Sequence, residues 1–188
     1  AMMIGIVSRL TDQKGFDLVA YVMDELCQDA VQIVALGTGE EQYENMFRHF
    51  AWKYPGKVSA NIYYSEAMSH KIYASCDAFL MPSLFEPCGL SQLMSLRYGT
   101  VPIVRETGGL KDTVIPYNEF DDSWNGFTFT NFVADDMLYT IKRAEMYYYD
   151  DKPTWEKLVK RNMEIDFSWE KSARAYIDIY EKAQQGWY

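Results

Sequence analysis

The amino-acid sequence predicts an α/β fold, a parallel sheet with helices on both faces that ends in additional helices. Short apolar runs alternate with segments of helical period along most of the 188 residues. Parallel strands need such crossover helices, and their burial on both faces produces near-continuous apolar runs. We find no internal repeat and no linker, so one domain, residues 1–188, is expected.

Six short apolar runs predict the strands, at residues 3–7, 31–36, 58–63, 78–81, 101–104 and 126–129. Helical spacing after the first run involves Phe16, Val19, Ala20, Met23 and Leu26. A second helix should end before Pro55, and Ser65 and Ser69 are candidate caps for a third. The order of the strands in the sheet does not follow from these patterns.

The chain changes character after the sixth expected strand, because only helical patterns follow. One long helix is predicted through Met137 and Ile141, and Pro153 lies near the start of another. Ser168 is expected to cap a last helix, at about residues 168–184.

Residues 81–110 contain the strongest indication of a binding site. Pro82 and Pro87 fix the backbone of a short loop between a strand and a helix, and this loop carries the Glu86 carboxylate. Gly89 then opens a helical pattern with Leu90, Leu93, Met94 and Tyr98 on one side. The free N–H groups and positive dipole end of such a helix favour an anionic ligand. Loops at the carboxyl ends of parallel strands are the usual ligand sites of open α/β sheets.

A second candidate is the loop after the first strand, which carries Arg9 and Lys14 five residues apart. Two cations on one ligand-side loop suit a diphosphate, since Arg binds oxygens in a fork and Lys acts as a point charge. From the residues alone, two solvated surface cations are an equally good interpretation. Gly37-Thr38-Gly39 is rejected as a dinucleotide fingerprint, because the third glycine is missing and two glutamates follow.

Composition excludes several functional classes. A formal net charge of -9 disfavours nonspecific binding to nucleic acids and anionic membranes, and no apolar run is long enough to span a bilayer. Cys27, Cys76 and Cys88 lack metal-site spacing and favour a reduced, cytoplasmic protein. His49 and His70 are isolated, so we expect no metal site, and His70 is interpreted as a helix-start residue with local hydrogen bonds.

Three segments resemble signatures of bacterial glycogen synthases and plant starch synthases. In chain order they are residues 8–15 (SRLTDQKG), 85–92 (FEPCGLSQ) and 105–114 (RETGGLKDTV). Those enzymes are retaining glycosyltransferases of the two-domain GT-B architecture that use ADP-glucose. The resemblance runs over essentially the whole chain but covers only the carboxyl-terminal, donor-binding half, which has a Rossmann-like sheet. Because a strand begins almost at residue 1, we expect a domain excised from a longer protein.

The resemblance implies a role for each candidate residue. Arg9 and Lys14 would bind the donor diphosphate and Glu86 the glucose hydroxyls, and these three form the expected catalytic set. Tyr64, preferred over Tyr63, would stack on adenine. The remaining contacts to sugar, phosphate and pocket wall would come from Cys88, Gly89, Leu90, Ser91, Thr107, Gly108 and Gly109. No metal and no cofactor is implied, since ADP-glucose is the donor substrate and ADP the product.

One departure from the pattern of related transferases narrows the resemblance to the synthases that use ADP-glucose. Many related transferases carry a second glutamate eight residues after the first, where this chain has Met94. The synthases that use ADP-glucose also lack it. The change removes any paired-carboxylate mechanism from this segment, so a glycoside hydrolase would lack its second acid.

The implied reaction is transfer of glucose from ADP-glucose to the non-reducing end of an α-1,4-glucan. In such enzymes the acceptor cleft belongs to the amino-terminal domain, and the last helix crosses back to it, so the fragment alone is expected to be inactive. The location would be the cytoplasm, or the plastid in a plant. Two alternatives are a GT-B transferase using UDP-glucose or another nucleotide sugar, and a non-catalytic nucleotide-binding module.

Overall fold

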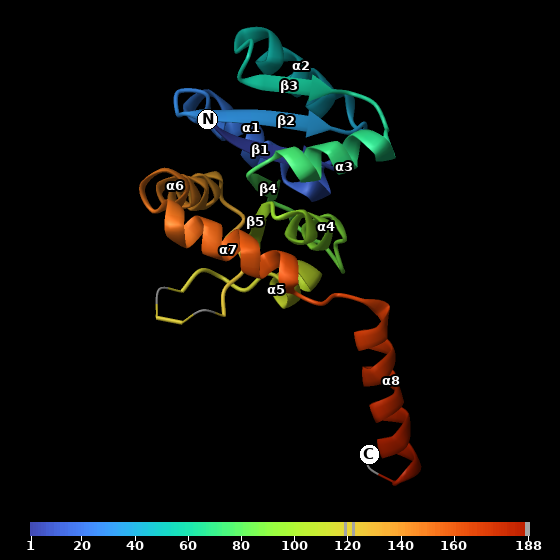
Figure 1. Ribbon diagram of the computed structural model, residues 1–188. Helices are drawn as coiled ribbons and strands as arrows, with labels where there is room; N and C mark the ends of the chain where they lie inside the picture. The colour runs from blue at the N-terminus through green and yellow to red at the C-terminus, as the bar shows by residue number, and fades with distance from the viewer. Residues whose placement is uncertain (119, 122, 187–188) are drawn as a thin grey trace.

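The computed structural model describes residues 1–118, 120–121 and 123–186. They form one six-stranded parallel sheet with strand order β3-β2-β1-β4-β5-β6 (Figure 1). The strands are β1 (Met2–Val7), β2 (Val31–Leu36), β3 (Val58–Asn61), β4 (Ala78–Met81), β5 (Val101–Arg105) and β6 (Phe127–Phe129). The predicted Rossmann-like fold is therefore confirmed.

One predicted strand boundary is wrong. The third strand was expected to continue to residue 63, but it ends at Asn61. The register explains the difference, because Asn61 is paired with Leu36, the last residue of β2. Beyond it the chain has no neighbouring strand to pair with, and Tyr63 and Tyr64 lie in a loop instead.

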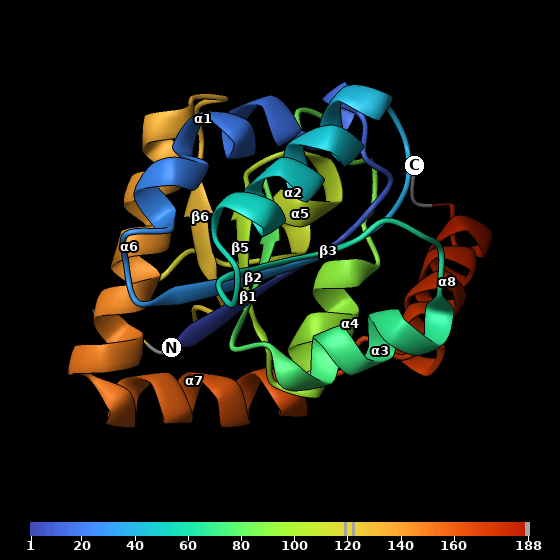
Figure 2. The ribbon, with the colours of Figure 1, turned by 90° about the horizontal axis from the view of Figure 1, so that it is seen from above.

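The helices cover both faces of the sheet, as the alternation predicted. They are α1 (Phe16–Leu26), α2 (Glu41–Lys53), α3 (Glu66–Ser75), α4 (Ser91–Tyr98), α5 (Gly108–Thr113), α6 (Ala134–Asp150), α7 (Lys152–Glu164) and α8 (Trp169–Gln184). Figure 2 shows α1, α2 and α6 on one side, and α3 and α4 on the other.

The core divides along the same two faces. Ile4, Leu80 and Ile103 point from the central strands into the main cluster, which they share with α1, α2 and α6. The opposite face holds two smaller clusters, in which Ile72 of α3 packs near β1 and β2, and Leu110 of α5 packs with β5. The central strands β1, β4 and β5 are thus largely buried on both sides, which accounts for their continuous apolar runs.

The helical end of the chain has two parts. α7 contacts α6, α4 and β5, and its Trp155 stacks near Phe127 of β6, with ring centroids 6.2 Å apart. In contrast, α8 extends away from the sheet in Figure 1 and has no buried residue. Ser168 occupies the N-cap position of α8 as predicted, but its side chain makes no capping hydrogen bond. At α3 the cap is Ser65, whose hydroxyl accepts from the Met68 N–H at 3.1 Å, whereas Ser69 lies inside the helix.

Helix α4 exists where it was predicted, but its expected apolar side is not a core face. Leu90 is 62% exposed, and Met94 and Tyr98 are also exposed. The buried residues of the helix are Gln92, Ser95 and Leu96, of which two are polar. A helix that turns apolar side chains to the surface and polar ones inward breaks the usual pattern, and such breaks concentrate at functional sites.

Among the helices within the described ranges, none combines the length and apolar character that crossing a bilayer requires. Likewise, the described part of the chain holds no group of three His, Cys, Asp or Glu side chains placed to bind a metal ion.

A carboxyl group on α6 makes the stability of the fold depend on pH. Burial raises the pKa of Glu145 from 4.5 to about 7, and the charge of Asp29 adds to this rise while Lys142 opposes it. One carboxyl oxygen of Glu145 is buried and has no hydrogen-bond partner among the described residues. Ionisation is therefore less favourable in the folded protein than in the unfolded chain.

We predict that Glu145→Gln stabilises the protein at pH 8 but not at pH 4. Because the folded pKa lies above the unfolded one, the folded state of the parent loses stability as pH rises from about 4.5 to 7. Glutamine cannot ionise, so the variant should gain about 1–2 kcal/mol in unfolding free energy at pH 8, allowing for solvent screening. Urea unfolding at both pH values measures this gain, and Glu156→Gln, which changes an exposed glutamate of α7, is the control. An equal gain at both values would contradict the assignment.

Candidate functional site

The main cleft of the protein lies at the carboxyl ends of the strands, where the strand order reverses. β1 pairs with β2 over six residues, from Met2 to Val7, but with β4 only at Ile4 and Gly5. Beyond Gly5 the two strands are no longer paired, although the loops that follow them meet again where the Leu84 N–H donates to the Gln13 carbonyl. Open α/β sheets bind ligands at this kind of switch point.

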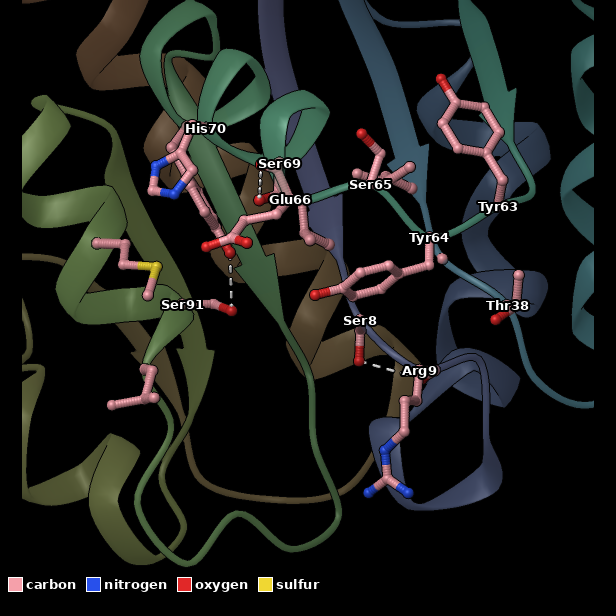
Figure 3. Close-up of a pocket in the computed structure, with 16 residues that line it drawn as sticks. Ser8, Arg9, Thr38, Tyr63, Tyr64, Ser65, Glu66, Ser69, His70 and Ser91 are labelled. Atoms are coloured by element: carbon pink, nitrogen blue, oxygen red, sulfur yellow. Dashed lines mark hydrogen bonds between the residues drawn. The ribbon is translucent and has the colours of Figure 1, made fainter.

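The cleft has a volume of about 510 Å³ and is built from four loops and two helix starts. Ser8 and Arg9 come from the loop after β1, Thr38 from the loop after β2, and Tyr64 from the loop after β3. Across from them, the first turn of α4 contributes Ser91 (Figure 3). Of the residues predicted from the sequence, Arg9, Tyr64, Leu90 and Ser91 line this cleft.

The glycines after β2 allow the loop after β2 to pack closely against the loop after β1. A Cβ on Gly37 would lie 1.8 Å from the Ser8 carbonyl oxygen, so only glycine allows the two loops to approach this closely. Leu10 and Gly39 also form an isolated parallel bridge. The loop after β2 thereby supports the loop that carries Arg9, which gives these glycines a role without a dinucleotide fingerprint.

Arg9 and Tyr64 stand at the mouth of the cleft. The Tyr64 side chain is 86% exposed, and Figure 3 shows its ring projecting into the space between Ser8 and Ser91. The ring of Tyr63 points away from that space. An exposed aromatic ring beside a cationic side chain can hold a flat base next to a phosphate group.

Lys14 and Glu86 form an ion pair that the sequence did not predict. The Lys14 Nζ lies 2.5 Å from Glu86 Oε2, and the two side chains are only 16% and 11% exposed. The Ser83 hydroxyl donates to the same carboxyl oxygen at 3.3 Å. Sequence reasoning assigned the two residues to different parts of a ligand, whereas the structure holds them in direct contact next to the cleft.

The loop that carries Glu86 is fixed by backbone and side-chain hydrogen bonds from two other segments. Gln13 Nε2 donates to the Phe85 carbonyl at 3.0 Å, and the Leu84 N–H donates to the Gln13 carbonyl at 2.9 Å. From β5, Arg105 donates to the Leu84 carbonyl at 2.9 Å. Glu86 is therefore held by its neighbours as well as by the two prolines.

Thr107, Gly108 and Gly109 lie behind this loop and do not line the main cleft. The Gly109 N–H donates to the Glu86 and Pro87 carbonyls, and a Cβ on Gly109 would lie 2.0 Å from the Cys88 carbonyl oxygen. Only glycine permits this approach. In this structure the segment acts as support, and its predicted contact with a ligand stays a prediction.

The start of α4 has free backbone donors. Leu90 holds the N-cap position and offers no side-chain acceptor, so the N–H groups of the first turn lack a capping partner. Cys88 is exposed, and Gly89 has a positive φ of 71°. Buried Gln92 donates to the Cys88 and Gly89 carbonyls and fixes the chain that leads into the helix.

His70 was misassigned from the sequence. It is the fifth residue of α3, not a helix-start residue, and its Nδ1 lies 3.0 Å from the hydroxyl of Tyr98 on α4. This contact spans 28 positions and is not local. Sequence reasoning also gave no role to Tyr73, because a buried tyrosine at helical spacing is typical of ordinary core packing.

Positive groups gather at the cleft although the whole chain is acidic, and they lie near two carboxylates, since Glu66 lines the cleft and Glu86 pairs with Lys14. Arg9 lines the cleft, Lys14 lies beside it, and the uncapped amino end of α4 adds a positive dipole end. Arranged donors of this kind can stabilise negative charge that grows on a leaving phosphate.

Comparison with known proteins places the chain in context. The family of glycosyl transferases group 1 matches residues 2–151. Glycogen synthase of Lachnospira eligens is 70% identical over 178 residues, and that of Lachnoclostridium phytofermentans is 63% identical over 181 residues. These matches cover 95% and 96% of this chain, but the chain spans only 37% and 38% of the two relatives.

Two solved structures share the fold of this chain. The catalytic domain of starch synthase IV from Arabidopsis thaliana, bound to ADP and acarbose, superposes with a TM-score of 0.87 at 36% identity. The match covers 96% of this chain and 38% of that one. Sucrose-phosphate synthase from Thermosynechococcus elongatus shares the fold, with a TM-score of 0.70 at 20% identity over 98% of this chain and 46% of that one.

We predict that the Lys14–Glu86 pair contributes to folding as a coupled unit. Glu86→Gln or Lys14→Met leaves one largely buried charge unpaired and should lower the unfolding free energy by about 1–3 kcal/mol. The double variant leaves no unpaired charge, so its loss should be smaller than the sum by about 0.5–2 kcal/mol.

Urea denaturation of the four proteins measures this coupling. The matched control is Glu156→Gln, which breaks the exposed Lys152–Glu156 pair at 3.9 Å and should change stability by less than about 0.5 kcal/mol. Strictly additive losses would show that the pair is not coupled.

Proposed function

Because this chain belongs to the family of glycosyl transferases group 1, we propose that it is the donor-binding half of a glycogen synthase. In the complete enzyme it would hold ADP-glucose, whose glucose is transferred with retention to the non-reducing end of an α-1,4-glucan. The observation that carries this proposal is the cleft where the strand order reverses. Arg9 lies on one side of this cleft, and the uncapped start of α4 lies on the other. The identities of 54–70% to glycogen synthases support it.

The diphosphate would lie between Arg9 and the first turn of α4. An Arg side chain can bind two phosphate oxygens in a fork, and backbone N–H groups at a helix start bind the others. Lys14 keeps two further N–H donors besides the one facing Glu86, so it can approach the phosphate without leaving its partner. These groups would stabilise the charge that grows as the diphosphate leaves, and no metal or cofactor is part of the proposal.

The glucose would lie next to Glu86. The Glu86 side chain is 11% exposed and its carboxylate is held by Lys14 and Ser83, so it is pre-oriented as an acceptor for sugar hydroxyls. The backbone of Cys88 and Gly89, fixed by Gln92, would complete this contact. Pre-orientation matters because a catalytic group must be in position before the reaction starts.

The base would stack on Tyr64. We propose adenine because the starch synthase IV structure contains ADP and is 36% identical to this chain. A UDP-dependent transferase and a non-catalytic nucleotide-binding module are the alternatives, and binding measurements with both nucleotides separate the first from the proposal.

The acceptor glucan and the rest of the catalytic machinery would be provided by the amino-terminal half of the enzyme. The chain spans only 37–38% of the length of these two glycogen synthase relatives. The exposed α8 would cross back to that half. The isolated chain would then bind donor without transferring glucose, because transfer requires both substrates to be held in contact. The free cysteines fit a cytoplasmic location, which is part of the proposal.

The first test of this function is nucleotide binding by the chain itself. We predict that it binds ADP more tightly than UDP in isothermal titration calorimetry, and that Arg9→Ala weakens ADP by about tenfold or more. Added salt should weaken ADP binding by the parent, since exposed charges are screened. Arg48→Ala on α2, outside the cleft, is the matched control. Unchanged ADP affinity in Arg9→Ala would rule out this diphosphate site.

The second test concerns the base. Tyr64→Ala should lower the affinity for ADP about threefold to thirtyfold and leave pyrophosphate binding nearly unchanged, because only ADP offers a ring to stack on. Tyr21→Ala on α1 is the matched control, since Tyr21 is 77% exposed and does not line the cleft. Equal losses for both ligands in Tyr64→Ala would indicate a structural role.

A further inference from the structure

A buried tyrosine on α3 contacts the start of α4 from below the cleft. Tyr73 is 3% exposed, and its hydroxyl donates to the Ser91 Oγ at 3.0 Å, as the dashed line at Ser91 in Figure 3 shows. Ser91 is the first residue of α4 and lines the cleft. Tyr73 also lines the cleft although it is largely buried, so this hydrogen bond joins two residues of the cleft lining.

The Tyr73 ring is held on several sides. It packs against Phe79 of β4 with ring centroids 5.1 Å apart, and against Tyr98 and His70 at 6.3 and 6.0 Å. Its carbonyl oxygen accepts a hydrogen bond from the buried Thr100 hydroxyl at the start of β5. Both the ring and the backbone of Tyr73 are thus fixed, so its hydroxyl has a set position beneath Ser91.

The direction of this hydrogen bond determines what Ser91 can do. Burial raises the pKa of Tyr73, so the phenol keeps its proton and remains a donor. A serine hydroxyl has one hydrogen and can accept as well as donate. When Ser91 accepts from Tyr73, its own hydrogen is directed elsewhere, and no other described residue accepts it. The open direction is the cleft, where the N–H groups of the same helix turn are also free.

We propose that Tyr73 is a positioning residue that orients the Ser91 hydroxyl as a hydrogen-bond donor to the bound diphosphate. This inference rests on the proposed function, because it assumes that a nucleoside diphosphate occupies the cleft beside α4. Ser91 touches the ligand, and Tyr73 acts only through Ser91.

The test is a double-mutant cycle in this chain with ADP, pyrophosphate and adenosine as separate ligands. Tyr73→Phe removes one oxygen atom and keeps the packed ring. It should lower the affinity for ADP and for pyrophosphate by about threefold to tenfold. Ser91→Ala should weaken them by at least as much. The double variant should bind like Ser91→Ala alone, because Tyr73 has nothing left to orient. Adenosine, which has no phosphate, should bind all four proteins equally.

Tyr98→Phe is the matched control. It removes a hydroxyl from the same aromatic group, but that hydroxyl faces His70 and not Ser91. Its affinity for ADP and pyrophosphate should equal that of the parent. Thermal unfolding of each variant identifies any loss of fold. If Tyr73→Phe does not fold, Ser91→Ala must still lower the affinity for pyrophosphate and leave the affinity for adenosine unchanged.

The outcomes separate this inference from the proposed function. If the folded parent does not bind ADP, the proposed function fails and the role of Tyr73 fails with it. If the parent binds ADP but Tyr73→Phe binds it equally well, only the inference is overturned. Two outcomes would show that Tyr73 acts on the fold and not through Ser91. One is that the two single-variant losses of ADP binding free energy add up in the double variant, and the other is that adenosine loses as much affinity as ADP.

Discussion

The short parallel pairing between β1 and β4 is the constraint on which the rest of the structure depends. All strands run in the same direction, so their carboxyl ends meet at one edge of the sheet. β1 and β4 pair over only two residues, and the cleft opens at this edge between the loops after β1, β2 and β3 and the helices α3 and α4. Every candidate ligand contact lies at this edge or supports it. The position of the site is thus a consequence of topology, and its chemistry is a consequence of the residues in the loops.

Rigid loops at that edge are obtained by close backbone packing. The contacts at Gly37 and Gly109 leave no room for a side chain, and they join loops that are far apart in the sequence. Gln92 and Arg105 then satisfy carbonyl groups of the loop that carries Glu86. The ion pair with Lys14 fixes the carboxylate itself. A preformed site of this kind loses little conformational freedom when a ligand binds, which favours both affinity and catalysis.

Arg9, Lys14 and the start of α4 converge on the cleft of a chain whose net charge is -9. The carboxylates of Glu66 and Glu86 lie beside them, the second in an ion pair with Lys14. Under the proposed function these positive groups would bind the diphosphate of the donor, while the acidic surface elsewhere would repel polyanions. The apolar side chains of Leu90 and Met94, which look misplaced on an exposed helix face, line the same cleft. They supply the surface that a ligand would cover, so the departure from normal helix patterning has a functional reason.

The sequence by itself determined the fold class, most element boundaries and the loops that carry the candidate site, because these depend on local periodicity, turn residues and short signatures. Tertiary structure decided the contacts between those loops. The Lys14–Glu86 pair joins residues 72 positions apart, and the Tyr73–Ser91 bond links two helices, so neither has a local signal. The wrong role for His70 and the apolar exposed side of α4 have the same origin, since periodicity gives the face of a helix but not what that face meets. Strand order was likewise undetermined, because each strand pattern specifies burial on both sides and not the identity of its neighbours.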